Sequence, residues 1–409
     1  MKSISLNRWD KLFGISYNKN KSVFLMVSFL FWFPHFIYIP ILSPYLQFLG
    51  GKYSFIGIVL GSYGLMQLLF RLPIGIFSDL LRFRKPFIIA GMLISSLSCL
   101  IFSLTDSLGW ILFARILAGI AAATWVTFTV LYSAYFTNKE VHRAMGSISF
   151  IVVLAQFLGM SFSGYILSEW GWRAPFIVGG VISLVGVISS FFIFEPKEKI
   201  VREPLKLKEL ILVMREPSLL FISLLSILAH SIIFTTMFGF IPTFALHIGY
   251  KASDISLFVV AFMIPHALAT LYTGKSIVPL LGEWKTLKYA FFLLTIFTLM
   301  IPLVQTKWVF IVVQGMNGFA LGIIFPLLLG MSIELIEHDK RATAMGAYQA
   351  LYAIGIFAGP FFAGILNSMF GIEAGFYFVG GLGAVAVLLI AFRNKIIRSS
   401  RPMITNKIT

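Results

Sequence analysis

Long apolar segments recur along almost the whole chain, and they constrain the fold more than any other feature of the sequence. A run of about 20 apolar residues is long enough for a helix to cross a hydrocarbon layer of about 30 Å. Charged residues, glycines and prolines separate twelve such segments. The predicted spans cover residues 22–48, 53–80, 86–105, 108–136, 143–168, 173–194, 218–246, 253–279, 285–304, 308–335, 341–369 and 374–392.

The composition supports a membrane protein and excludes a water-soluble domain. Hydrophobic residues make up 59% of the 409 residues, charged residues only 12%, and the mean hydropathy is +0.93. Such a chain cannot cover its apolar surface in water. We therefore predict an all-α integral membrane protein with twelve transmembrane helices. The single cysteine, Cys99, lies inside an apolar run, so no disulfide or paired-cysteine metal site is expected within one chain.

The distribution of Lys and Arg orients the predicted spans. If the amino terminus is cytosolic, 26 of the 32 basic residues lie near the cytosolic side. Only Lys52, Arg173, Lys251 and Lys307 fall in the opposite loops. This asymmetry favours a cytosolic location for both termini. The net charge of +16 is thus a topology signal, and its dispersal over many short loops argues against nucleic-acid binding.

The two halves of the chain resemble each other. The motif AMG at residues 144–146 recurs 200 residues later, and FLGMSFSG at 157–164 recurs as FAGPFFAG at 357–364. Two six-helix bundles related in this way are what a transporter needs to tilt one bundle against the other around a central site. The predicted organisation is a cytosolic lead-in at 1–21, a bundle at 22–194, a cytosolic linker at 195–217, a bundle at 218–392 and a cytosolic tail at 393–409.

Three motifs follow one another along the predicted spans. The loop signature GxxxDxxGRR/K is partly met by Gly75, Asp79, Arg84 and Lys85, although Arg82 and Phe83 replace its Gly and first Arg. Arg115 and Gly119 match the pattern RxxxG in the fourth span. The pattern GxxxGPxxxG is intact in the eleventh span as Gly355, Gly359, Pro360 and Gly364, and weakened in the fifth as Ala155, Gly159, Met160 and Gly164. With these motifs the chain resembles the major facilitator superfamily over essentially its whole length.

The charged segment from Gly75 to Pro86 is interpreted as a cytosolic gate. Asp79 can cap the amino-terminal end of a neighbouring helix, where free N–H groups and the macrodipole attract an anion. The resemblance places that end on the eleventh helix. Arg84 and Lys85 are then expected to pair with an acid at a nearby helix end, for which Glu140 is the candidate. The alternative is that these bases only enforce membrane topology.

Polar residues at membrane depth are candidates for a substrate cavity, because a buried charge costs about 2.5 to 3.5 kcal/mol on insertion. The resemblance implies that helices one, four, seven and ten line that cavity. It would then be lined by Arg115, His35, His230, Gln314 and Asn317, with Gln156, His266 and Gln349 from other helices and Trp32, Tyr38 and Trp125 as flat apolar surface. The alternative for each lone histidine or amide is a hydrogen bond between helices.

The positions of the sixteen acidic residues restrict the solute and the coupling ion. All sixteen fall in loops or at span ends, the deepest being Asp79 and Glu334. A cavity without a carboxylate favours anionic, zwitterionic or neutral solutes. If protons drive transport, a histidine is the expected carrier, since its pKa lies near physiological pH, and His35 is the first choice.

The small residues of the GxxxG-like patterns are expected to let helices approach closely, and Pro360 permits a bend. The resemblance associates GxxxGPxxxG with proton-coupled exporters when it lies in the fifth helix, where this chain has Met160 instead of Pro. This departure weakens the expectation of antiport.

Motifs for nucleotide or metal chemistry are absent from the sequence. There is no GxxxxGK[ST] loop and no HExxH, so no enzyme, cofactor or metal is expected. We predict a monomeric secondary transporter of the plasma membrane that exports a drug-like or metabolite molecule in exchange for protons. The alternatives are a proton-coupled uptake symporter for an organic anion or nutrient and, more remotely, a sensor or scaffold that does not transport.

Overall fold

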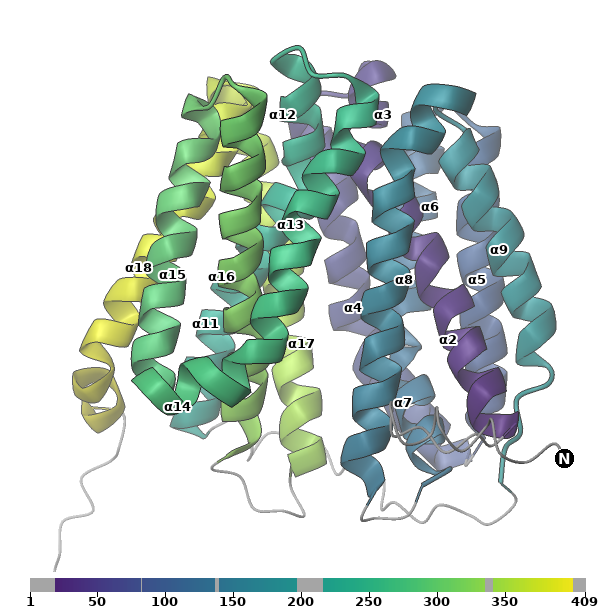
Figure 1. Ribbon diagram of the computed structural model, residues 1–409. Coiled ribbons are helices and arrows are strands. Elements are labelled where there is room, and N and C mark those ends of the chain that lie inside the picture. The colour runs from purple at the N-terminus through teal and green to yellow at the C-terminus, as the bar shows by residue number, and fades with distance from the viewer. Residues whose placement is uncertain (1–18, 82, 137–139, 197–215, 335–340, 400–409) are drawn as a thin grey trace, which may run out of the picture. The chain divides into compact units, whose positions relative to one another are not determined.

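The computed structural model describes residues 19–81, 83–136, 140–196, 216–334 and 341–399 (Figure 1). Most of the predicted lead-in, linker and tail lies outside these residues. Every regular element in the described residues is helical. The elements are α2 (Lys19–Ile37), α3 (Ile39–Phe48), α4 (Tyr53–Leu81), α5 (Lys85–Leu104), α6 (Leu108–Ala123), α7 (Trp125–Ser133), α8 (Val141–Trp170), α9 (Ala174–Ser190), α11 (Pro217–Thr235), η2 (Thr236–Phe240), α12 (Ile241–His247), α13 (Ala252–Tyr272), η3 (Thr273–Ile277), α14 (Val278–Leu281), α15 (Glu283–Met300), η4 (Ile301–Leu303), α16 (Lys307–Glu334), α17 (Arg341–Phe370) and α18 (Glu373–Ser399).

The helices match the predicted membrane spans. Among the described residues, eleven continuous helical segments are long and apolar enough to cross a membrane. The twelfth predicted span corresponds to α9, an apolar helix of 17 residues, or about 26 Å. The prediction of an all-α membrane fold is therefore confirmed.

Two of the spans are broken near one end at an Ile-Pro pair. The first passes from α2 to α3 at Tyr38, just before Pro40. The seventh passes from α11 through the π-helix η2 to α12, just before Pro242. Proline lacks an N–H group, which costs nothing in the first turn of a helix, where the N–H groups have no partner within the helix, and Pro40 and Pro242 lie in the first turns of α3 and α12. Each break therefore starts a new short helix.

The chain divides into two compact units. Unit 1 comprises residues 1–204 and 239–259, and unit 2 comprises residues 205–238 and 260–409. In unit 1, α4 packs against α6, α5 against α6 and α9, and α2 against α8 and α9 (Figure 1). In unit 2, α11 packs against α17, and α15 against α16 and α18.

Residues 239–259 belong to unit 1 although the sequence places them in the second half of the chain. They carry α12, which packs against α3, and the first turns of α13, which approach α8. The hydroxyl oxygens of Ser43 on α3 and Thr243 on α12 lie 2.6 Å apart, and both side chains are fully buried. This pair joins segments that are 200 residues apart in the sequence.

Close helix packing occurs at the small residues expected from the sequence. A methyl group on Gly119 of α6 would lie 2.8 Å from the carbonyl oxygen of Tyr63 on α4. On α17, a methyl group on Gly355 would lie 2.2 Å from the carbonyl oxygen of Ile227 on α11. Similar close backbone contacts occur at Gly159, Gly164 and Gly359. Gly364 and Pro360 are buried, and α17 runs through Pro360 as one helix.

Candidate functional site

Arg115 lies inside unit 1, where aromatic rings surround its guanidinium group. Its side chain is 1% exposed, and its Nη1 donates a hydrogen bond to the hydroxyl of Tyr38 at 3.3 Å. The guanidinium carbon lies 4.2 Å from the ring centre of Tyr63, which is a cation–π distance. Its Nε has no hydrogen-bond partner in the described residues. The charge is thus stabilised mainly by aromatic faces and retains an unused donor.

His35 on α2 lies near the same cluster and is buried. Its Nδ1 is 2.8 Å from the carbonyl oxygen of Phe31, and because a carbonyl only accepts, Nδ1 must donate. The neutral ring therefore presents Nε2 as an unprotonated nitrogen. Nε2 has no hydrogen-bond partner among the described residues in this form, and the Ala118 carbonyl lies next to it. The Tyr63 ring centre is 6.4 Å from that of His35. The ring can therefore accept one further proton.

The predicted apolar wall adjoins this cluster. The ring centre of Trp125, on the first turn of α7, lies 5.2 Å from that of Trp32. Trp32 in turn lies 5.6 Å from His35. Unit 1 thus brings together His35, Tyr38 and Arg115, with both tryptophans beside them. Gln156, on α8 of the same unit, is half-buried.

The predicted residues of unit 2 fall into two groups, and the first is aromatic. The ring of His230 on α11 is parallel to that of Tyr352 on α17, with centres 4.1 Å apart. Phe325 on α16 lies 4.8 Å from His230 and 6.2 Å from His266. The two predicted histidines therefore flank Phe325. Neither Tyr352 nor Phe325 was singled out by the sequence, because a single aromatic residue in an apolar span carries no signal of its own.

The second group lies along α16. Asn317 is buried, and its Oδ1 accepts a hydrogen bond from Thr298 on α15 at 3.4 Å. This contact favours the alternative of a bond between helices for Asn317. Gln314 is fully buried, and neither atom of its amide has a partner in the part of the chain that the structure describes. Gln349, on α17, is half-buried.

A polar pair on α4 was missed by the sequence prediction. Arg71 is 6% exposed and Gln67 is 4% exposed, and Nη2 of Arg71 donates a hydrogen bond to Oε1 of Gln67 at 2.6 Å. The available signal was an arginine in the middle of a predicted span, four residues after a glutamine. Both side chains belong to the buried face of α4.

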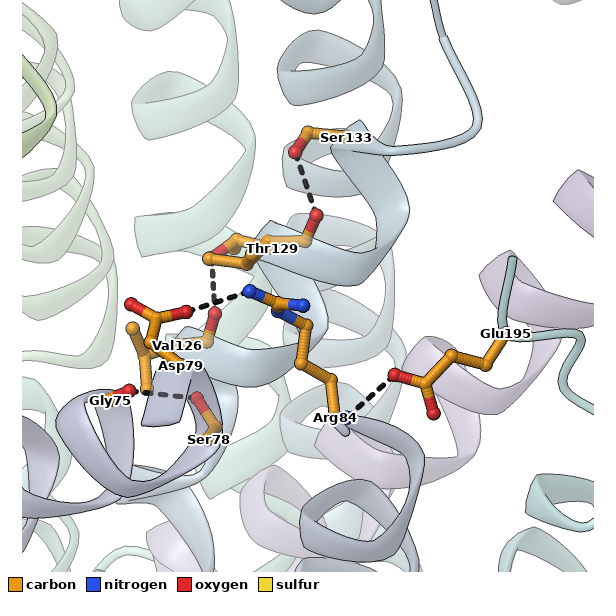
Figure 2. A network of polar contacts seen from close by, with 9 residues as sticks. Gly75, Ser78, Asp79, Arg84, Val126, Thr129, Ser133 and Glu195 are labelled. Carbon is orange, nitrogen blue, oxygen red and sulfur yellow. Dashed lines mark hydrogen bonds and ion pairs between the residues drawn. The ribbon is translucent and has the colours of Figure 1, made fainter. Parts of the chain in front are cut away.

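The predicted gate residues meet at the junction of α4 and α5. Figure 2 shows the Arg84 side chain directed toward Asp79 while its backbone faces Glu195. Nη2 of Arg84 lies 2.7 Å from Oδ1 of Asp79, and the two side chains are 4% and 13% exposed. Gly75 accepts a hydrogen bond from Ser78 one turn later on α4. The Arg84–Asp79 pair therefore closes the α4–α5 turn within unit 1.

The acid that meets the backbone at the start of α5 is Glu195, and the expected pairing of Glu140 with Arg84 or Lys85 stays a prediction. The carboxylate of Glu195 accepts hydrogen bonds from the backbone N–H groups of Arg84, at 2.7 Å, and Lys85, at 3.1 Å. An anion is favoured there because the first N–H groups of a helix lack partners within it. Glu140 precedes α8 as its N-cap residue. Glu195 is 110 residues away from Lys85 in sequence, so local spacing did not reveal it. The expected capping of the eleventh helix by Asp79 stays a prediction.

Two further contacts bind the segment after α9 to this junction. Nζ of Lys85 donates to the carbonyl of Phe191 at 2.7 Å, and the hydroxyl of Tyr135 donates to the carbonyl of Phe194. Burial raises the pKa of the Tyr135 phenol, and the nearby Glu195 carboxylate raises it further. The phenol therefore stays protonated and remains a hydrogen-bond donor at physiological pH.

We expect the substitution Glu195→Gln to destabilise this junction. An amide has one carbonyl oxygen where the carboxylate has two, and it carries no charge to meet the helix macrodipole. The expected loss is about 1 kcal/mol, the usual value of a helix cap. The thermal unfolding midpoint in detergent measures it, with Glu169→Gln, an exposed acid at the end of α8, as the control. Equal midpoints for the two variants would remove the capping role.

A second ion pair of unit 1 lies at the α5–α6 loop. Asp106 accepts a hydrogen bond from the hydroxyl of Tyr45 at 2.8 Å and pairs with Arg173 at 2.6 Å. The hydroxyl, followed by the guanidinium, lowers the pKa of the Asp106 carboxyl. Both charged side chains are about half exposed, so solvent screens the pair.

Comparison of the sequence with known protein families identifies the family of this chain. The sequence profile of the Major Facilitator Superfamily matches residues 24–307 and 236–403. The chain belongs to the Major Facilitator Superfamily. Like other members of this superfamily, it is a multi-pass membrane protein and a transporter of small molecules.

Characterised relatives within the Major Facilitator Superfamily include drug-resistance proteins. Multidrug resistance protein 2 of Bacillus subtilis is 31% identical over 185 residues, which are 44% of this chain and 46% of that protein. The inner membrane transport protein YajR of Escherichia coli is 26% identical over 87% of this chain and 79% of its own length. The quinolone resistance protein NorA of Staphylococcus aureus is 23% identical over 91% of this chain and 96% of its own length.

Solved structures of the superfamily share the fold. A mutant of the nucleoside transporter NupG superposes with a TM-score of 0.77 at 14% identity, over 91% of this chain and 99% of that chain. A bacterial homologue of the human lysosomal transporter Spinster, in an inward-facing and occupied conformation, gives a TM-score of 0.76 at 14% identity, covering 94% of this chain and 98% of its own. At these identities the similarity establishes the fold alone.

Proposed function

We propose that this superfamily member exports a small organic solute across the plasma membrane in exchange for protons, by alternating access. The observation that carries the proposal is the similarity to the quinolone resistance protein NorA over 91% of the chain. The match to a multidrug resistance protein over 44% of the chain supports the same direction of transport. The proposal includes a monomer. It also places both termini in the cytosol, an orientation that the excess of basic residues in one set of loops supports.

The polar cluster of unit 1 offers groups for binding and coupling. Arg115 supplies a permanent positive charge, and Tyr38 and Tyr63 supply aromatic surface beside it. We propose His35 as the proton carrier, because its Nε2 is open to protonation and because its ring and the guanidinium of Arg115 both lie near the ring of Tyr63. A proton on His35 would place a second positive charge near Arg115. The added charge would strengthen binding of an anionic solute, which suits symport, and weaken binding of a cationic one, which suits exchange, so protonation and solute binding at this cluster are linked.

Inside-out membrane vesicles test the export proposal directly. With the vesicle interior acidified, we expect a quinolone, a cationic dye or an anionic dye to accumulate inside and to leave when an ionophore collapses the gradient. Vesicles from cells that lack the protein are the control. Absence of accumulation for every solute under an acidic interior would contradict proton-coupled export.

The second candidate is a proton-coupled uptake symporter for an organic anion. The buried Arg115 supports an organic anion as the solute, because a positive site attracts an anion. In right-side-out vesicles with an acidic exterior, a symporter accumulates the solute, whereas an exporter that exchanges it for protons depletes the solute from the interior. The sign of the gradient that drives accumulation therefore separates the two candidates.

Replacement of His35 by Gln is expected to uncouple transport from the proton gradient. Glutamine can still donate to the carbonyl of Phe31 but cannot take up a proton. Accumulation driven by the pH gradient is expected to fall to the level of vesicles without the protein, while exchange of labelled for unlabelled solute continues. The variant His247→Gln, at the end of α12, is the control. Unchanged dependence on the pH gradient would exclude His35 as the carrier.

A further inference from the structure

The buried face of α4 carries a second guanidinium group that the proposed function does not yet use. Tyr63, Gln67 and Arg71 follow one another at intervals of four residues, so they share one face of the helix. Their side chains are 5%, 4% and 6% exposed. The face is therefore polar over two helical turns at a depth where the neighbouring residues are apolar.

Arg115 extends this face from the neighbouring helix α6. Its guanidinium carbon lies 4.2 Å from the ring centre of Tyr63, at one end of the series. At the other end, Arg71 donates to Oε1 of Gln67, so its guanidinium reaches back by one turn toward Tyr63. The Cα atoms of residues 63 and 71 are about 12 Å apart along the helix axis. We call Arg115, Tyr63, Gln67 and Arg71 the arginine row.

The arginine row holds two permanent positive charges without an acidic residue among its members. Guanidinium groups stay protonated in proteins. The acid of α4 is Asp79, two turns beyond Arg71, and it is paired with Arg84. Neither α2 nor α6 contains an acid. Because charges interact strongly in a medium of low dielectric constant, an anion that enters between the two ends of the row is attracted by both guanidinium groups.

The donors of the arginine row fit an oxyanion. Planar guanidinium groups match the geometry of carboxylate and phosphate oxygens. Nε of Arg115 is an unused donor in the described residues. Because Oε1 of Gln67 accepts from Arg71, the amide nitrogen of Gln67 keeps its hydrogens for another acceptor. Aromatic surface from Tyr63 and Tyr38 lies beside these donors.

We propose that the arginine row binds the anionic group of the transported solute, a carboxylate or a phosphate ester attached to an organic body. This inference rests on the proposed transport function and names the substrate class of that site. Arg71 and Gln67 hold the oxygens of the anion, and Arg115 supplies the second positive charge. Because Arg71 lies in the interior of α4, several turns from its first residue, Tyr53, the anion sits deep in unit 1 rather than at a membrane surface.

Binding of matched probes to the purified full-length protein tests this inference. The probes share one ring: benzoate, phthalate and phenyl phosphate as anions, benzamide as the neutral analogue and benzyltrimethylammonium as the cation. We expect the anions to bind at least about tenfold more tightly than the other two. Substitution Arg71→Gln is expected to weaken anion binding by about 10- to 100-fold, the effect of losing one charge-assisted contact.

Two further variants separate binding from folding. Arg71→Lys keeps the charge and is expected to recover part of the anion affinity. Ser62→Ala removes a buried hydroxyl next to Tyr63 that bonds to its own helix, and it is expected to leave anion affinity unchanged. The unfolding midpoint of each variant without ligand shows whether it folds. If Arg71→Gln does not fold, the anion affinities of Arg71→Lys and wild type are compared. A lower affinity of Arg71→Lys supports the inference, and equal affinity contradicts it.

The outcomes distinguish this inference from the transport proposal. Three results would overturn the inference. They are equal affinity for benzoate and benzamide, no binding of any anion, and an anion affinity that neither Arg71 substitution changes. If a neutral or cationic solute still accumulates in the vesicles in these cases, the transport proposal stands. If anion binding depends on Arg71 but no solute is transported, the anion site is supported and the transport proposal is contradicted.

Discussion

Replacing Gly355 with alanine is expected to lower the free energy of unfolding by about 3 kcal/mol or more. The added methyl group would lie 2.2 Å from the carbonyl oxygen, 2.9 Å from the carbonyl carbon and 3.0 Å from the Cα of Ile227. All three are backbone atoms of α11, so no side chain can turn away to make room. The hydroxyl of Ser231 on α11 also donates to the carbonyl of Gly355 at 3.3 Å. The substitution must push α11 and α17 apart.

The same helix provides a matched control for this prediction. A methyl group on Gly346 of α17 would meet no atom within 4 Å in the part of the chain that the structure describes. Since alanine is favoured over glycine in a helix by up to about 1 kcal/mol, Gly346→Ala is expected to be neutral or stabilising. The thermal unfolding midpoints of both variants in one detergent measure the difference. A midpoint for Gly355→Ala within error of that for Gly346→Ala would show that α11 and α17 do not need the close contact.

Replacing Asp79 with asparagine is expected to cost about 3 to 5 kcal/mol, because it leaves the guanidinium of Arg84 buried without its partner. The two groups are 2.7 Å apart, and the Arg84 side chain is only 4% exposed. Removing both charges with Asp79→Asn and Arg84→Gln together is expected to cost less than the sum of the single changes. The coupling expected from such a cycle is about 1 to 3 kcal/mol.

The pair of Asp106 and Arg173 serves as the control for burial. Its charged atoms are 2.6 Å apart, but both side chains are about half exposed. Asp106→Asn is therefore expected to change the unfolding midpoint little, because solvent already screens that pair. Equal costs for Asp79→Asn and Asp106→Asn would contradict a special role for burial at the α4–α5 junction. Transport measured on the same variants shows whether the junction also acts as a gate.

The sequence predicts the fold well because hydrophobic length and the positions of glycine are local signals. Each predicted span corresponds to a helical segment, and the shortest of these segments is α9, which ends at Ser190. The expected proximity of Arg115 and Tyr38 is also seen.

The contacts that the sequence did not predict are of two kinds. Some join residues that are far apart in the sequence, and others involve residue types that are common in apolar spans. Glu195 reaches the start of α5 from a segment 110 residues away, and only the packing of α5 against α9 brings it there. Tyr352 stacks on His230, although one tyrosine among the 14 of this chain carries no signal. Arg71 was visible in the sequence, but its hydrogen bond to Gln67 and its burial required the structure.

Alternating access is tested most directly by a reversible cross-link between Ser43→Cys and Thr243→Cys in a Cys99→Ala background. The two hydroxyl oxygens are 2.6 Å apart, so cysteine sulfurs at these positions are within reach of a disulfide. Alternating access should require residues 43 and 243, which come from the two halves of the sequence although both lie in unit 1, to separate in each cycle. We predict that oxidation reduces transport to the background level and that a reductant restores it, while the single-cysteine variants stay active. Full transport by protein shown to be completely cross-linked would contradict the mechanism.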